Sequence, residues 1–125
     1  HCVTFSQTLE RVKARFGDRV AVISVVSSAS DNAGTVASYI KANRVTIPIL
    51  FDCGQMMASY LQMNSSRQSV DLPHVFLIDA QGVIRNDYPY SLIHRPVFEG
   101  DALLGEVGKL LGGAPPPRVP ARKAR

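Results

Sequence analysis

The feature that most constrains the fold is an apolar, mostly β-branched run over positions 20–26, Val-Ala-Val-Ile-Ser-Val-Val. Such a run suits a strand that is buried on both faces, as in parallel sheets that helices cover. The segment before it carries an apolar stripe at helical spacing, formed by Phe5, Leu9, Val12 and Phe16. Gly17 then stands where a helix can end in the left-handed conformation. A helix followed by a buried strand predicts an α/β fold.

The rest of the chain continues this alternation. The patterns predict a second helix that Ser30 or Asp31 caps and that ends near Asn43, a strand over 49–51, a short helix around 56–61, a hairpin of 74–79 with 83–88, and a last helix around 103–111. A polar stretch over 64–71 precedes the hairpin. We therefore expect a central mixed sheet flanked by helices.

The helix at the start of the chain raises a question of topology. Right-handed β-α-β units place a strand before such a helix. We expect the first core strand to be missing from this chain, which predicts an unfilled slot in the sheet. A neighbouring molecule's strand or the Pro-rich tail could cover that slot, so a homo-oligomer through the incomplete sheet is one expectation.

Composition and charge exclude several classes of function. Two cysteines rule out a disulfide-rich scaffold and a Cys₂His₂ or Cys₄ zinc site, and we expect no metal and no cofactor. No apolar run is long enough to span a membrane. Of the 14 Lys and Arg residues, four lie in the last eight positions, so the other 117 residues carry ten basic and ten acidic groups. We interpret 1–111 as the domain and 112–125 as a Pro-rich basic tail, and expect no nucleic-acid partner.

Three segments carry a resemblance to a known family. Cys2 stands in the first turn of the first helix, 47–52 reads Ile-Pro-Ile-Leu-Phe-Asp, and 72–84 reads Leu-Pro-His-Val-Phe-Leu-Ile-Asp-Ala-Gln-Gly-Val-Ile. Over residues 1 to about 111, the pattern resembles the thioredoxin-like superfamily. Within it, the chain is most similar to the redoxin branch of TlpA-like thiol-disulfide oxidoreductases and AhpC/TSA-type peroxiredoxins.

The resemblance implies where a redox site lies. In such folds the proline that matches Pro73 is cis and faces the redox cysteine, here Cys2. The backbone of Leu72 would then pair edge-on with a bound thiol or disulfide substrate, either a protein or a small molecule. His74 stands where many relatives carry Thr, and it either tunes the thiolate and contacts substrate or merely points into the sheet.

The chemistry of Cys2 leaves alternatives open. A thiol at a helix N-terminus is favoured as thiolate, which attacks a disulfide sulfur in thiol-disulfide exchange. TlpA-like enzymes carry a second cysteine three residues earlier, and by this resemblance Cys2 is the resolving partner of an upstream thiol. The alternatives are that Cys2 is a lone peroxidatic cysteine or a plain core cysteine. A redox-inactive thioredoxin-like binding module is the non-enzymatic alternative.

Cys53 is a candidate second thiol or a buried small side chain, and Asp52 accepts a proton or caps the next helix. Nothing in the sequence decides between an exported, periplasmic protein and a cytoplasmic one.

Overall fold

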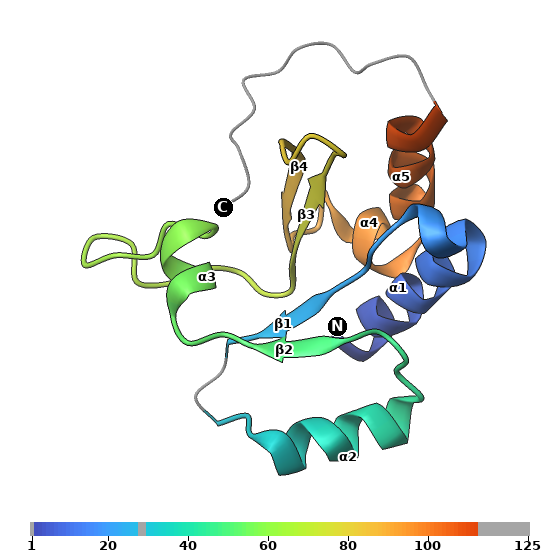
Figure 1. Cartoon of the computed structure of the whole chain (residues 1–125). Helices are drawn as coiled ribbons and strands as arrows, with labels where there is room; N and C mark the ends of the chain where they lie inside the picture. Colours follow the sequence, from blue (N-terminus) through green and yellow to red (C-terminus); the bar gives the residue numbers. More distant parts are fainter. Residues whose placement is uncertain (1, 28–29, 113–125) are drawn as a thin grey trace.

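The computed structural model describes residues 2–27 and 30–112. In chain order its elements are α1 (Cys2–Phe16), a 3₁₀ turn η1 (Gly17–Arg19), β1 (Ser24–Val26), α2 (Ala33–Asn43), β2 (Ile49–Phe51), α3 (Gln55–Ser59), β3 (His74–Ile78), β4 (Ile84–Pro89), α4 (Arg95–Glu99) and α5 (Ala102–Gly112) (Figure 1). The expected basic tail lies, from residue 113 on, outside the described residues.

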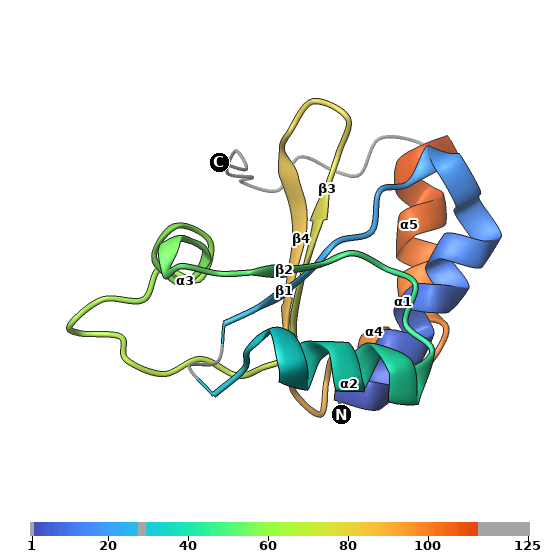
Figure 2. The same ribbon diagram turned by 60° about the horizontal axis from the view of Figure 1, so that its bottom comes forward.

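The strands form two separate ladders. β1 and β2 are parallel, with Ser24 opposite Ile49, and β3 and β4 are antiparallel, with Val75 opposite Tyr88. The expected mixed sheet is therefore present as one parallel and one antiparallel pair, which are not hydrogen-bonded to each other among the described residues. In both views α1 lies on one side of the strands and α3 on the other (Figures 1 and 2).

The core lies between α1, α4 and α5 and one face of the β3–β4 hairpin. All four residues of the expected α1 stripe are buried, which confirms that prediction. Phe98 and Leu103 are 0% and 1% exposed, and the Phe5 ring packs edge-on against Phe98 at 4.9 Å between centroids. Val75, on β3, packs against this cluster from the hairpin side.

The first strand is shorter and more exposed than its sequence suggests. Only Ser24–Val26 pair as a strand, and Ile23 is 58% exposed, so the expectation of a strand over 20–26 buried on both faces is wrong for the described residues. Among the described residues β1 pairs with the equally short β2 alone, so only three positions of the run are held in a ladder.

The N-cap of the second helix lies one residue after Asp31 and two after Ser30, the two proposed caps. Asn32 is the N-cap: its side chain accepts from the amides of Gly34 (2.9 Å) and Thr35 (3.1 Å), and the Thr35 hydroxyl accepts from the Asn32 amide in return. Ser30 and Asp31 were therefore the wrong choices, although the predicted end at Asn43 is confirmed.

The sequence analysis also missed α4, which begins at Arg95 with Pro96 in its first turn. A proline there costs no hydrogen bond, because the first amides of a helix have no helical partner.

Candidate functional site

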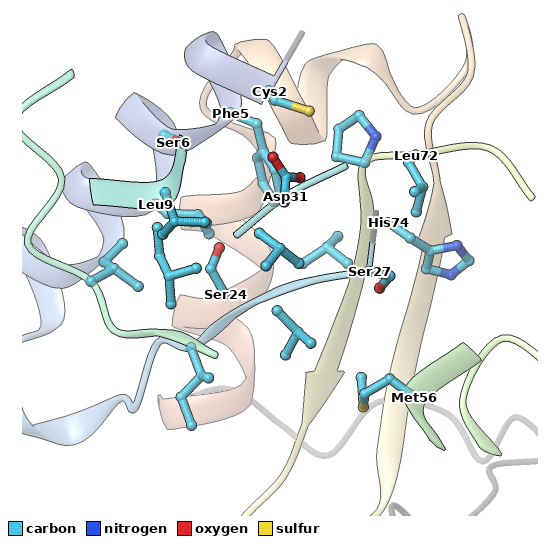
Figure 3. Close-up of a pocket in the computed structure, with 18 of the residues that line it drawn as sticks. Cys2, Phe5, Ser6, Leu9, Ser24, Ser27, Asp31, Met56, Leu72 and His74 are labelled. Atoms are coloured by element: carbon cyan, nitrogen blue, oxygen red, sulfur yellow. The ribbon is translucent and has the colours of Figure 1, made fainter. Parts of the chain in front are cut away.

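An apolar groove of about 670 Å³ opens between α1, α2, β1, β3 and the start of α3. Four of the five residues singled out by the sequence analysis line it: Cys2, Leu72, Pro73 and His74 (Figure 3). The structure thus brings together side chains that are about seventy positions apart in the chain.

Cys2 is the first residue of α1, and its thiol is free and exposed. The backbone carbonyl of Cys2 accepts a hydrogen bond from the Tyr39 hydroxyl of α2 (3.1 Å), which in turn is hydrogen-bonded to the Ser6 hydroxyl. The first turn of α1 carries no acidic residue of its own, so no carboxylate of this turn offsets the positive end of the helix. α2 therefore holds the start of α1 in place, with the thiol at the groove.

Leu72 and Pro73 lead into β3. The Leu72–Pro73 peptide bond is cis, and Leu72 is 51% exposed. The carbonyl of Pro73 accepts from the amide of Tyr90 (3.1 Å), which ties this segment to the chain just beyond β4.

His74 follows on β3 with a side chain that is 7% exposed. Its Nε2 pairs with Oδ1 of Asp87 on β4, and its ring stacks on Phe76 at 4.6 Å between centroids. Nδ1 is buried and has no hydrogen-bond partner among the described residues. The ring therefore packs along the hairpin, and Asp87 is a contact that the sequence analysis missed. Asp87 is 13 positions from His74 and stands opposite Phe76, so this contact depends on hairpin register, for which the sequence offered no local signal.

Asp31 is a second residue that the sequence analysis did not place in the site. It lines the groove as the sole carboxylate among the lining residues that the structure describes (Figure 3). A carboxylate in the same groove disfavours a thiolate.

Cys53 is free and exposed but does not line the groove. It follows β2, and the carboxylate of its neighbour Asp52 accepts from the amides of Met56 (2.9 Å) and Met57 (3.3 Å) at the start of α3. The capping role proposed for Asp52 is thus confirmed, while Cys53 as a buried small side chain is wrong for this structure.

In residues 2–27 and 30–112, no group of three or more His, Cys, Asp and Glu side chains gathers where it could hold a metal ion. None of the helices described here combines the length and apolarity needed to cross a membrane.

The fold and the groove define an α/β protein that presents an exposed thiol at a helix start. A comparison with protein-family models identifies the class more closely, because the model described as "AhpC/TSA family" matches residues 1–87. That match covers more than half of the 125 residues, and the chain belongs to this family of thioredoxin-like, redoxin-type thiol oxidoreductases and peroxidases. Searches of curated proteins and of solved structures gave no match.

Proposed function

We propose that this protein is a thiol-disulfide oxidoreductase in which Cys2 is the reacting thiol. The observation that carries the proposal is the joint position of Cys2, Leu72, Pro73 and His74 around one groove. The family membership supports the same class of chemistry. Cys2 also has two properties that favour exchange, an accessible thiol and a position at the positive end of a helix.

The reaction conserves atoms and electrons. The Cys2 thiolate attacks one sulfur of a substrate disulfide, the substrate S–S bond breaks, and a new S–S bond joins Cys2 to the substrate. The departing sulfur leaves as a thiolate and takes a proton from water. A second thiol then attacks the mixed disulfide, releases Cys2 as a thiolate, and is itself oxidised.

The neighbouring residues orient the substrate. Leu72 is half-exposed at the groove, and its main chain is the proposed edge for pairing with a peptide that carries the disulfide. Pro73, next in sequence, is the proposed wall opposite the thiol, and His74, which also lines the groove, is the proposed substrate contact on β3.

The test compares two single-cysteine variants. Reduction of insulin or oxidised glutathione, with dithiothreitol as the final reductant, is measured for the unmodified chain, Cys2→Ser and Cys53→Ser. We expect Cys2→Ser to reduce the rate at least about tenfold. Cys53→Ser changes a residue outside the groove and should leave the rate unchanged. Equal rates for the unmodified chain and Cys2→Ser would refute the role of Cys2 and favour a redox-inactive binding module.

Peroxide reduction is the second candidate, which the AhpC/TSA match favours. In that reaction the Cys2 thiolate attacks a peroxide oxygen, the O–O bond breaks, and Cys2 becomes a sulfenic acid while hydroxide leaves. A second thiol reduces the sulfenic acid, forming a disulfide and water. Peroxide consumption together with trapping of Cys2 by dimedone would assign this reaction, whereas disulfide reduction without trapping would assign thiol-disulfide exchange.

A further inference from the structure

The groove-lining residue His74 has its polar partner outside the groove. Its Nε2 pairs with a carboxylate oxygen of Asp87, which belongs to β4 and does not line the groove. The His74 side chain is 7% exposed and that of Asp87 is 43% exposed, so the contact joins a buried ring to a half-exposed carboxylate. A ring this buried has little access to water, so solvent does not replace a lost partner. Asp87 therefore fixes where the His74 ring lies.

The main-chain ladder of the hairpin is weak where β3 begins. The carbonyl of Pro73 accepts from the amide of Tyr90 (3.1 Å), but a proline has no amide with which to return the bond. The next pair along the hairpin is His74 with Pro89. In an antiparallel ladder, bonded pairs alternate with pairs whose main-chain groups point away from each other, and this pair is of the second kind. A single main-chain bond therefore ties the residue before β3 to the residue after β4.

The side chains supply a second connection at the same end of the hairpin. Asp87 stands opposite Phe76, so it is a diagonal neighbour of His74 on one face of the hairpin, within reach of an aromatic side chain. The Phe76 ring stacks on that of His74 at 4.6 Å between centroids, and the Tyr60 ring meets Phe76 edge-on at 5.3 Å. Aromatic groups thus hold the imidazole plane, while the Asp87 carboxylate holds its Nε2 and connects β4 to the first residue of β3.

We infer that Asp87 is a positioning residue of the groove, which acts through His74. By holding the first residue of β3 against β4, it keeps the main chain of the two preceding residues, Leu72 and Pro73, in place at the groove. That main chain is the proposed edge for pairing with a substrate peptide, so this inference rests on the proposed function. Loss of the Asp87 contact should therefore weaken binding of a polypeptide disulfide more than it slows the chemical step at Cys2.

The first measurement is amide hydrogen exchange in the ¹⁵N-labelled chain and in its Asp87→Ala variant. We expect the Tyr90 amide, which donates to Pro73, to exchange at least about tenfold faster in Asp87→Ala, because the hairpin opens more often at this end. The Asp79 amide, which donates to Val83 at the turn end of the same hairpin (2.9 Å), is the reference for global unfolding and should keep its rate. Asp87→Asn retains an acceptor oxygen and should restore most of the protection of Tyr90.

The second measurement is the steady-state rate of insulin reduction, with dithiothreitol as the final reductant. We expect Asp87→Ala to raise KM for insulin by about three- to tenfold and to change kcat by less than about twofold, because substrate binding is affected and the reacting thiol is not. Asp79→Ala is the matched control for lost stability. It removes a carboxylate at the other end of the hairpin, where Asp79 accepts from the Val83 amide and pairs with Arg85, and it should leave KM unchanged.

Two results would overturn the role of Asp87. One is an exchange rate of the Tyr90 amide that stays the same in Asp87→Ala, and the other is a change in KM no larger than that caused by Asp79→Ala. Failure of the proposed function gives a different result, because the unmodified chain would then show no rate of insulin reduction that depends on Cys2. In that case the exchange rate of the Tyr90 amide still decides whether Asp87 holds this end of the hairpin.

Discussion

Removing the hydroxyl of Thr8 tests how α1, the helix that carries Cys2, is held on the core. Thr8 is 1% exposed, and its hydroxyl donates to the carbonyl of Phe98 at 2.8 Å, across ninety positions of sequence. Thr8→Val keeps the shape of the side chain but leaves the buried Phe98 carbonyl without this donor. An unsatisfied buried polar group costs about 1–3 kcal/mol, so we expect the free energy of unfolding to fall by that amount.

The matched control is Thr8→Ser, which keeps the hydroxyl and loses one buried methyl group. Burial of a methylene-sized group contributes about 0.8 kcal/mol, so this variant should lose less stability than Thr8→Val. The assay is urea unfolding followed by far-UV circular dichroism, with the denaturant slope compared among all three proteins. If Thr8→Val were as stable as the unmodified chain while Thr8→Ser were weaker, packing and not the hydrogen bond would hold α1 on α4.

Three further predictions concern the cap of α2, an acidic turn and the groove. Asn32→Ala removes the cap of α2 and should lower the free energy of unfolding, measured in urea, by about 1 kcal/mol. Asn32→Asp keeps a side-chain acceptor and should retain most of the stability that the cap contributes. The Val83 amide donates to the Asp79 carboxylate at 3.0 Å and lowers the pKa of that carboxyl. The stability that ionised Asp79 contributes is therefore present above the ordinary pKa of an Asp and is lost as pH falls through the lowered value. Asp79→Asn should flatten the acid side of the profile of unfolding free energy measured between pH 7 and pH 2. Asp31→Asn removes the one carboxylate among the described groove-lining residues, so iodoacetamide alkylation of Cys2 at neutral pH should become faster, and an unchanged rate would show that Asp31 does not influence the thiol.

The parts of the fold that the sequence could predict are those with a strong local pattern. The apolar stripe from Phe5 to Phe16 repeats at the helical period, which predicts both the helix and the burial of this face against the core. The β3–β4 hairpin follows from the apolar run of β3 and the tight turn after it, where Gly82 takes the positive φ of 80° that favours glycine.

The parts that escaped prediction depend on partners distant in sequence. The length of the strand in the run over 20–26 depends on pairing, and among the described residues β1 pairs with β2 alone over three positions, so the apolar composition overstated the length of the strand. For the candidate site, the spacing of Cys2 and Pro73 could be matched to a family pattern, whereas the Asp87 contact of His74 depends on hairpin register. One residue of slip would have placed Asp87 on the other face of the hairpin.

Anchoring and chemistry occupy different parts of α1, and this separation has a testable consequence. Thr8 and Val12 are buried on the face toward the core, while Cys2, at the start of the helix, is exposed and held through its carbonyl by Tyr39 of α2. Weakening the Thr8 contact therefore lowers global stability without changing what surrounds the thiol in the folded state. Tyr39→Phe, by contrast, removes the donor to Cys2 and should change the alkylation rate of the thiol by more than it changes the free energy of unfolding. If the Thr8→Val and Tyr39→Phe variants shifted both quantities in the same proportion, the start of α1 would be positioned by the core alone and not by α2.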